Sequence, residues 1–238
     1  NLKVILRQGE TKNETLIIKN IGTTIFDVNV ILTDVEKFKI FPEINELVTT
    51  LNPDEEKTIG FVFKALEDEI PDIYPGRIIL KSPSVEKEVV TVVEVDSAQP
   101  LFDVDIEVLP HSKTALPGEE ILVEVNLFNV RGFGRVDVNI EYVIKDLQGN
   151  VIGVEHETLA VETQAKFTRR LLVPSDVKPG TYVASAKVIY DHFVGVSSDL
   201  FEVKAKTIKL YPIPITYYRA MLLIGAFVLI AGIFIFSA

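Results

Sequence analysis

Two stretches of the sequence decide the fold, because they repeat one another: residues 9–30 read GETKNETLIIKNIGTTIFDVNV, and residues 118–140 read GEEILVEVNLFNVRGFGRVDVNI. Each opens on Gly-Glu, reaches an Asn eleven residues after the Gly, passes a Gly-containing turn and ends in an alternating run that begins Asp-Val-Asn. Self-similarity of this kind is typical of a repeated structural unit. The equivalent residues lie 109 or 110 positions apart, so the chain is predicted to contain two copies of one unit.

A Pro-Gly pair near the end of each copy extends the repeat. Pro75-Gly76 and Pro179-Gly180 are each followed by an apolar run, and we expect them to open equivalent strands. Their spacing of 104 residues, smaller than that of the first motifs, is attributed to loops of different length. A short polar stretch at residues 96–100 is the predicted boundary between the copies, and so short a linker limits their relative motion.

The hydrophobic pattern before residue 207 has a period of two, as in Phe26-Asp27-Val28-Asn29-Val30 and in residues 136–143. This alternation predicts strands with one wet face. Turn signals containing Gly, Pro, Asn or Asp interrupt the strands at the intervals of a β-sandwich, and no long amphipathic helix is present. A copy of roughly a hundred residues with about seven short strands has the size and rhythm of an immunoglobulin-like sandwich.

This order of motifs resembles the extracellular immunoglobulin-like modules of prokaryotic surface proteins, namely the adhesion-related CARDB type and the similar module appended to some glycosidases. The residues that carry the resemblance are the Gly-Glu openings, the strands that end in Asn20 and Asn129, and the late Pro-Gly pairs. The Cys, Trp, Cys pattern of antibody domains is absent. The resemblance covers nearly all of residues 1–206 and implies an archaeal or other prokaryotic cell-surface protein.

Residues 220–236, AMLLIGAFVLIAGIFIF, carry no charge and predict a transmembrane helix. Tyr217, Tyr218 and Arg219 precede this run as interfacial anchors, and the 22 residues from 217 to 238 would extend roughly 33 Å as a helix, enough to cross a bilayer. Gly225 and Gly232 lie on one helix face, where they would permit close approach of a second helix, although both also suit an ordinary membrane helix. A buried helix of a large globular core is the alternative.

The predicted fold class is therefore all-β, with two tandem immunoglobulin-like β-sandwiches followed by a single C-terminal transmembrane α-helix. The predicted parts are sandwich 1 at 1–96, sandwich 2 at 97–206, a juxtamembrane linker at 207–216 and the membrane helix at 217–238.

The orientation of the chain is predicted from opposing signals. Basic residues precede the membrane segment and none follows it, which favours a tail-anchored cytoplasmic protein. The start at Asn1 instead of Met suggests a trimmed product, and the all-β character is common on cell surfaces. We expect a single-pass protein of the cell membrane with its β-domains outside the cytoplasm.

The composition excludes several function classes. A formal net charge of −10 repels polyanions, so no nucleic-acid partner is expected. Without Cys there is no disulfide framework, no Cys-containing zinc site, no Fe–S cluster and no thiol nucleophile. No cofactor is expected.

Catalytic and metal-binding patterns are sparse. The three histidines, His111, His156 and His192, lack ligand or triad spacing, and no HExxH, GxSxG or glycine-rich phosphate loop is present. Asp191-His192 with Ser197 or Ser198 contains the residue types of a triad, but neighbours on a strand point to opposite faces. The acidic loop at residues 67–72 lacks the alternation of a calcium loop and is interpreted as solvated. The protein is not expected to be an enzyme.

Three residues are candidate contact points. Asn13 lies in the only N-glycosylation sequon, Asn13-Glu14-Thr15, at an expected turn before the second strand. Phe133 lies between two glycines, and Phe193 lies in a second loop; loop-tip aromatics either bury in a partner or fold back on their own sandwich.

The sequence thus predicts a non-catalytic, membrane-anchored surface protein whose sandwiches act in structural assembly, adhesion or protein–protein interaction. Its expected partners are the lipid bilayer and either a partner protein or further copies of the chain, with a glycan as an option. One alternative is an accessory subunit of a larger membrane complex for translocation, glycosylation or transport. Another is carbohydrate binding by one sandwich, through an aromatic such as Phe133, although the chain lacks the Trp most expected there.

Overall fold

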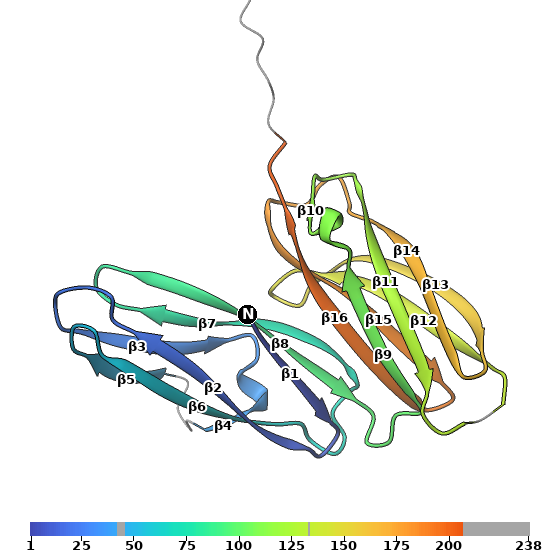
Figure 1. The fold of residues 1–238 in the computed structure, drawn as a ribbon, viewed down its shortest axis with the longest axis horizontal. Coiled ribbons are helices and arrows are strands. Elements are labelled where there is room, and N and C mark those ends of the chain that lie inside the picture. The colour runs from blue at the N-terminus through green and yellow to red at the C-terminus, as the bar shows by residue number, and fades with distance from the viewer. Residues whose placement is uncertain (42–45, 133, 207–238) are drawn as a thin grey trace, which may run out of the picture. The chain divides into compact units, whose positions relative to one another are not determined.

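Strands dominate the computed structural model, which describes residues 1–41, 46–132 and 134–206 (Figure 1). The prediction of an all-β fold is confirmed, because the described residues form strands and only two short 3₁₀ helices, η1 at Glu36–Phe38 and η2 at Pro110–Ser112. Residues 1–205 form one compact unit.

The strands of residues 1–96 form two sheets, and we refer to this pair as the first sandwich. The larger sheet has the order β1-β8-β7-β3-β5, and the smaller has the order β2-β6-β4. The strands are β1 Leu2–Arg7, β2 Thr11–Lys19, β3 Phe26–Thr33, β4 Lys39–Phe41, β5 Glu46–Leu51, β6 Glu56–Lys64, β7 Asp72–Lys81 and β8 Glu86–Asp96. One hydrophobic cluster takes residues from both sheets, including Leu6, Val30, Phe61 and Val93, and therefore lies between them.

The strands of residues 102–203 form a second pair of sheets, which we refer to as the second sandwich. The orders are β10-β16-β15-β12-β13 and β14-β11-β9. The strands are β9 Phe102–Val108, β10 Thr114–Ala115, β11 Glu120–Asn129, β12 Val136–Lys145, β13 Val151–Val161, β14 Gln164–Leu172, β15 Gly180–Tyr190 and β16 Phe193–Val203. A separate hydrophobic cluster again joins the two sheets.

The two sandwiches follow one strand plan. In each larger sheet the last strand pairs in parallel with an early strand, β1 with β8 and β10 with β16, and all other strand pairs are antiparallel. Burial follows the predicted period of two, most regularly in β9, where apolar residues are buried and the intervening acids are exposed. The alternation arises because neighbouring strand residues point to opposite faces.

The repeated Gly-Glu motif forms the same turn in both sandwiches. Gly9 and Gly118 have φ values of 78° and 86°, a left-handed conformation that glycine adopts without strain. The carboxylate of Glu10 accepts a hydrogen bond from the amide of Arg7, and that of Glu119 accepts one from Leu116, both at 2.8 Å. The motif is therefore a self-capped turn.

The repeated Asn closes the next turn. Asn20 and Asn129 are both buried, and their amide nitrogens donate to backbone carbonyls at 2.9 Å, of Thr24 and Glu162 respectively. Their side-chain oxygens accept from the amides of Gly22 and Gly132. A buried side chain that supplies both donors and acceptors can hold a turn whose backbone groups would otherwise be unpaired.

A tyrosine defines a third equivalence, which corrects one expectation from the sequence. The hydroxyls of Tyr74 and Tyr182 each donate to the carbonyl four residues upstream, of Ile70 at 2.6 Å and Lys178 at 2.7 Å. The strand registers place Asp72 opposite Val95 and Gly180 opposite Val203, so the two tyrosines are equivalent. The predicted equivalence of Gly76 and Gly180 is wrong: Gly76 lies inside β7, whereas Gly180 begins β15.

Close packing explains why residue 76 is a glycine. A Cβ at Gly76 would lie 2.5 Å from the carbonyl oxygen of Thr33 and 2.7 Å from a methyl group of Val35. At Gly60 in β6, the same atom would have no neighbour within 4 Å.

We therefore expect Gly76→Ala to lower the free energy of unfolding by about 1–3 kcal/mol, because the backbone must shift to admit the methyl group. Gly60→Ala is the matched control and should be neutral or stabilising by up to about 1 kcal/mol. Urea unfolding of both variants checks this, and equal losses would contradict the close approach of β7 to Thr33.

Candidate interaction site

The structure places the three predicted contact residues in different surroundings. Asn13 lies within β2, opposite Val62, and not in a turn; its side chain is exposed. Phe193 begins β16, is partly buried, packs against the core of the second sandwich and lies 4.0 Å from the His192 ring. Phe133 lies outside the described residues, as do Tyr217, Tyr218, Arg219, Gly225 and Gly232 of the predicted membrane anchor.

The Asp191-His192 pair corrects a second expectation. These residues form the turn between β15 and β16, not a strand, and Asp191 has a φ of 55°. Their side chains therefore do meet, with 2.7 Å between His192 Nδ1 and Asp191 Oδ2, and both are largely exposed. Ser197 and Ser198 are buried within β16 and engaged elsewhere, so the three residue types do not assemble into a triad.

The acidic loop at residues 67–72 is engaged in ordinary contacts. The Glu69 carboxylate lies 2.8 Å from Lys37 Nζ, and that of Asp72 lies 2.8 Å from Lys145 Nζ. In the described part of the chain, no group of three or more His, Asp or Glu side chains is arranged to hold a metal ion.

A small apolar cluster joins the two sandwiches, and we call it the junction cluster. Its buried members are Ile73 of β7, Val92 of β8, Val183 of β15 and Val196 of β16. The first two come from the first sandwich and the last two from the second. The cluster gives the two units a shared hydrophobic contact in addition to their covalent link.

Lys145 reinforces the junction from the second sandwich. Its side chain is only 8% exposed, and its ammonium donates to Asp72 Oδ2 and to the carbonyl oxygen of Ile73, both at 2.8 Å. A charge buried to this degree is tolerated because it is paired and hydrogen-bonded.

Glu94 forms the opposite arrangement, an acid of the first sandwich held in part by the second. Its side chain is 1% exposed and accepts a hydrogen bond from Ser198 at 2.6 Å, while Lys3 lies 2.8 Å away. The Lys3 ammonium also donates to the Ser198 carbonyl. Burial raises the pKa of Glu94, although Lys3 and Ser198 oppose that shift.

Asp96 and Ser97 complete the junction with backbone contacts. Asp96 accepts from the Val196 amide at 2.8 Å, and Ser97 exchanges hydrogen bonds with Val194 through its amide and its hydroxyl. Burial raises the pKa of Asp96 to about 6, with Glu94 and Asp103 adding to the effect, while the Val196 amide and Arg7 oppose it. The first two residues of the predicted linker, Asp96 and Ser97, are thus tied to β16.

A second feature is an apolar groove at one end of the first sandwich, with a volume of about 590 Å³. Its floor reaches core residues such as Ile18, Val28 and Leu51, and Ile21 and Val85 stand exposed at its rim. Lys19 and Lys87 also line it. We call this the apolar groove throughout.

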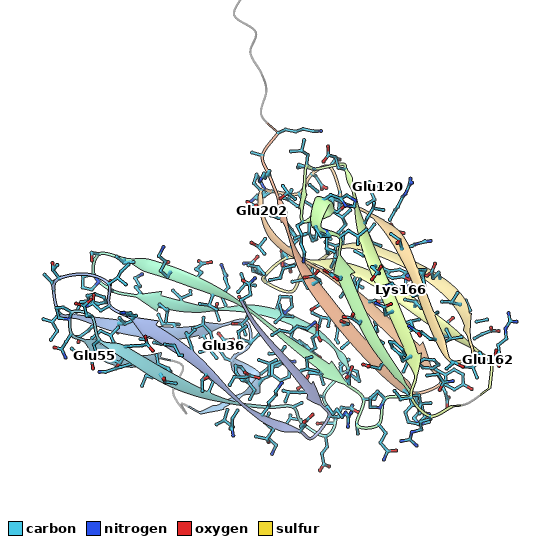
Figure 2. The ribbon with its side chains drawn as sticks, viewed as in Figure 1. Glu36, Glu55, Glu120, Glu162, Lys166 and Glu202 are labelled. Carbon is cyan, nitrogen blue, oxygen red and sulfur yellow. The ribbon has the colours of Figure 1, made fainter. Side chains whose placement is uncertain are left out.

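Acidic side chains project from several elements of both sandwiches. Figure 2 shows labelled carboxylates projecting from separate elements of both sandwiches, among them Glu36, Glu55, Glu120 and Glu202. Some are paired, as Glu124 is with Lys166 at 2.6 Å.

Comparison with known proteins gives no family. No protein-family model matches the chain, and no curated protein matches it. Among the described residues, no helix has the length and apolar character needed to span a membrane.

Sequence reasoning missed both the junction and the groove. Glu94 interrupts an otherwise apolar run from Val92 to Val95, and Lys145 ends the apolar half of β12. A charged residue within an apolar run was therefore the sequence signal that could have indicated the junction. Their partners are 72 to 104 residues away in sequence, which no local pattern reveals.

Replacing Lys145 tests the junction. Lys145→Met keeps the length of the side chain but removes its hydrogen bonds to Asp72 and Ile73, so the free energy of unfolding should fall by about 1–3 kcal/mol. Lys166→Met, which breaks an exposed pair, should cost at most about 1 kcal/mol. Urea unfolding measures both, and an equal effect would mean that Lys145 adds nothing beyond a surface pair.

The pKa of Asp96 predicts a pH dependence of stability. Because its folded pKa is raised from 3.8 to about 6, the folded state binds more protons in this window, and stability falls as the pH rises through it. Asp96→Asn should remove that component while keeping the acceptor for Val196.

The difference in stability between the two proteins should therefore change most steeply between pH 4 and 6. The variant should gain stability relative to the parent as the pH rises, by at most about 1.4 kcal/mol per pH unit. Parallel stability curves across this range, from denaturant unfolding at each pH, would contradict the raised pKa of Asp96.

Proposed function

We propose that this chain is a non-catalytic, membrane-anchored surface protein whose two sandwiches serve structural assembly, adhesion or protein–protein interaction. The observation that carries the proposal is the junction, where apolar residues and buried, paired charges from both sandwiches meet. Such a junction holds two β-domains at a fixed angle, which suits a protein whose role is to present surfaces.

We propose further that both sandwiches are immunoglobulin-like. The two-sheet plan and the tyrosine whose hydroxyl binds a carbonyl four residues upstream both support this class. The resemblance to the CARDB-type modules of prokaryotic surface proteins remains part of this proposal.

The membrane anchor rests on the sequence alone. Residues 220–236 are uncharged and follow two tyrosines and an arginine, and the β-domains are proposed to lie outside the cytoplasm. The proposed partners are the bilayer and a protein, either another copy or a different chain.

Cross-linking with mass spectrometry on native membranes tests the proposed role. Links between copies, or to other surface proteins through loops of residues 1–206, would support an assembly or adhesion function. Links mainly from residues 204–209 and the anchor into a polytopic protein would favour an accessory subunit and overturn the surface role.

A charge pair in the proposed span tests the anchor. The double variant Val228→Asp, Leu229→Arg should shift the protein from the membrane pellet to the carbonate-soluble fraction, because a charge at the centre of a span costs about 3 kcal/mol. Val130→Asp, which creates the same Asp-Arg pair beside the existing Arg131 outside the anchor, serves as the control and should stay in the pellet. Retention of the anchor variant would contradict the proposed span.

A further inference from the structure

The outward face of the smaller sheet in the first sandwich carries an uncharged strip. Directly opposed residues of paired strands share a face, and three such pairs of β2 and β6 form the strip. The pairs are Asn13 with Val62, Thr15 with Gly60 and Ile17 with Thr58. The three side chains from β2 are exposed, and the residues that alternate with them are more buried.

The equivalent face of the second sandwich is charged. The motif spacing of 109 residues makes Thr15 the counterpart of Glu124. The strand registers make Thr58 the counterpart of Lys166, and Glu124 pairs with Lys166 at 2.6 Å. The shared strand plan therefore does not explain why the strip of the first sandwich lacks charge.

The uncharged strip is apolar in part and open at its centre. Ile17 is 60% exposed, and Val62 is partly exposed. At Gly60 an added Cβ would meet no atom within 4 Å, so the strip has room for a bulky group between these two residues. Apolar surface is stabilised when such a group removes it from water.

The strip contains the two defining residues of the N-glycosylation sequon Asn13-Glu14-Thr15. Within the described part of the chain, neither the Asn13 carboxamide nor the Thr15 hydroxyl has a hydrogen-bond partner. Glu14 points to the opposite face of the strand, where its carboxylate lies 3.3 Å from Lys12 Nζ. Asn13 and Thr15 are thus both exposed and unengaged, on the same face of one strand.

We propose that Asn13 carries an N-linked glycan whose sugars lie over the uncharged strip. This inference rests on the proposed position of the β-domains outside the cytoplasm, because sequons are modified in secreted segments. The co-reactant is a lipid-linked oligosaccharide phosphate, used by a cellular transferase. A bond forms between Asn13 Nδ2 and the anomeric carbon of the sugar, while the bond from that carbon to the phosphate oxygen breaks. The phosphate leaves with the electron pair, and the proton lost from Nδ2 balances its charge.

A glycan suits this strip for two reasons. One face of a sugar ring is apolar and can cover Ile17 and Val62, and the small residues Thr15 and Gly60 leave space for the ring. The sugar hydroxyls remain in water, and a glycan is bulky and solubilising. It therefore supplies the hydration that charged side chains supply on the equivalent face of the second sandwich.

Mass spectrometry of the full chain, purified in mild detergent from the membranes of the cells that produce it, tests the modification. Trypsin cleaves after Lys12 and Lys19, so the sequon lies in the peptide NETLIIK, residues 13–19. We expect most copies of this peptide to carry an added sugar mass on Asn13, with sugar ions released on fragmentation. Finding this peptide only in its unmodified form would overturn the inference.

Three variants separate the sequon from other sources of added mass. Asn13→Gln removes the attachment atom, and Thr15→Ala removes the hydroxyl that the sequon requires, so each should abolish the added mass. Thr15→Ser keeps a hydroxyl and is the matched control, which should retain the modification. An added mass that survives Asn13→Gln would overturn the assignment to Asn13.

Thermal unfolding tests the position of the sugars. Asn13→Gln from the same cells should unfold about 2–4 °C below the glycosylated parent, because the uncharged strip loses its cover. The same two proteins made in a bacterial cytosol without N-glycosylation should unfold at equal temperatures, which excludes an effect of the amide exchange itself. Equal unfolding temperatures of the variant and the glycosylated parent would overturn the placement of the sugars over the strip.

Labelling of intact cells with a membrane-impermeant amine reagent distinguishes failure of this inference from failure of the proposed function. Labelled lysines in the sandwiches with an unmodified Asn13 would overturn the glycosylation and leave the proposed location in place. A glycosylated Asn13 in a chain that cross-links only to a polytopic protein would support the inference and overturn the surface role. Unlabelled lysines together with an unmodified Asn13 would overturn both.

Discussion

The buried charges between the two sandwiches are the interaction on which the arrangement of the compact unit depends. Lys145 reaches from the second sandwich to Asp72 and Ile73, and Glu94 of the first is held by Ser198. A buried charge is costly unless its partners are in place, so each sandwich completes a site that the other begins. The junction cluster adds apolar contact between these two points. Relative motion of the sandwiches would break both pairs together.

Much of the fold follows from local pattern. Alternation predicted the strands because one face of each is buried, and the Gly-Glu and Asn motifs identified equivalent turns because each turn is closed by its own side chains. The Pro-Gly pairs misled because Gly76 is required by a close approach to Thr33, a contact far away in sequence, and not by a turn. The residues that are in fact equivalent in these two strands are Tyr74 and Tyr182. A single tyrosine in each copy is not a sequence motif, so the sequence did not reveal this equivalence.

The candidate site was less accessible to sequence reasoning for a related reason. Asn13 was expected in a turn, but the Gly-Glu turn ends before it, and β2 has already begun at Thr11. The junction joins residues 72 to 104 positions apart, and the two sandwiches differ at a strand position that β9 fills in the second and that no strand fills among the described residues of the first. Such a difference is visible only when the two copies are compared as structures.

The two sandwiches share one strand plan but differ at one edge of the smaller sheet, beside β2 in the first and beside β11 in the second. In the second sandwich, β9 completes the sheet and its apolar residues close the core. In the first, inward charges protect one half of β2, while the other half remains apolar and adjoins the groove. Exposed edges invite unwanted pairing, and the inward charges of Lys12 and Glu14 discourage it along that half of β2.

The lysines at the apolar groove give it a local charge that the net charge of the chain does not predict. A formal charge of −10 repels an acidic segment at long range, but at physiological ionic strength this field is screened beyond about 8 Å. Lys19 and Lys87 act within that distance, at the mouth of the groove. The charge that a ligand would meet at the groove is therefore set by these two lysines rather than by the net charge of the chain.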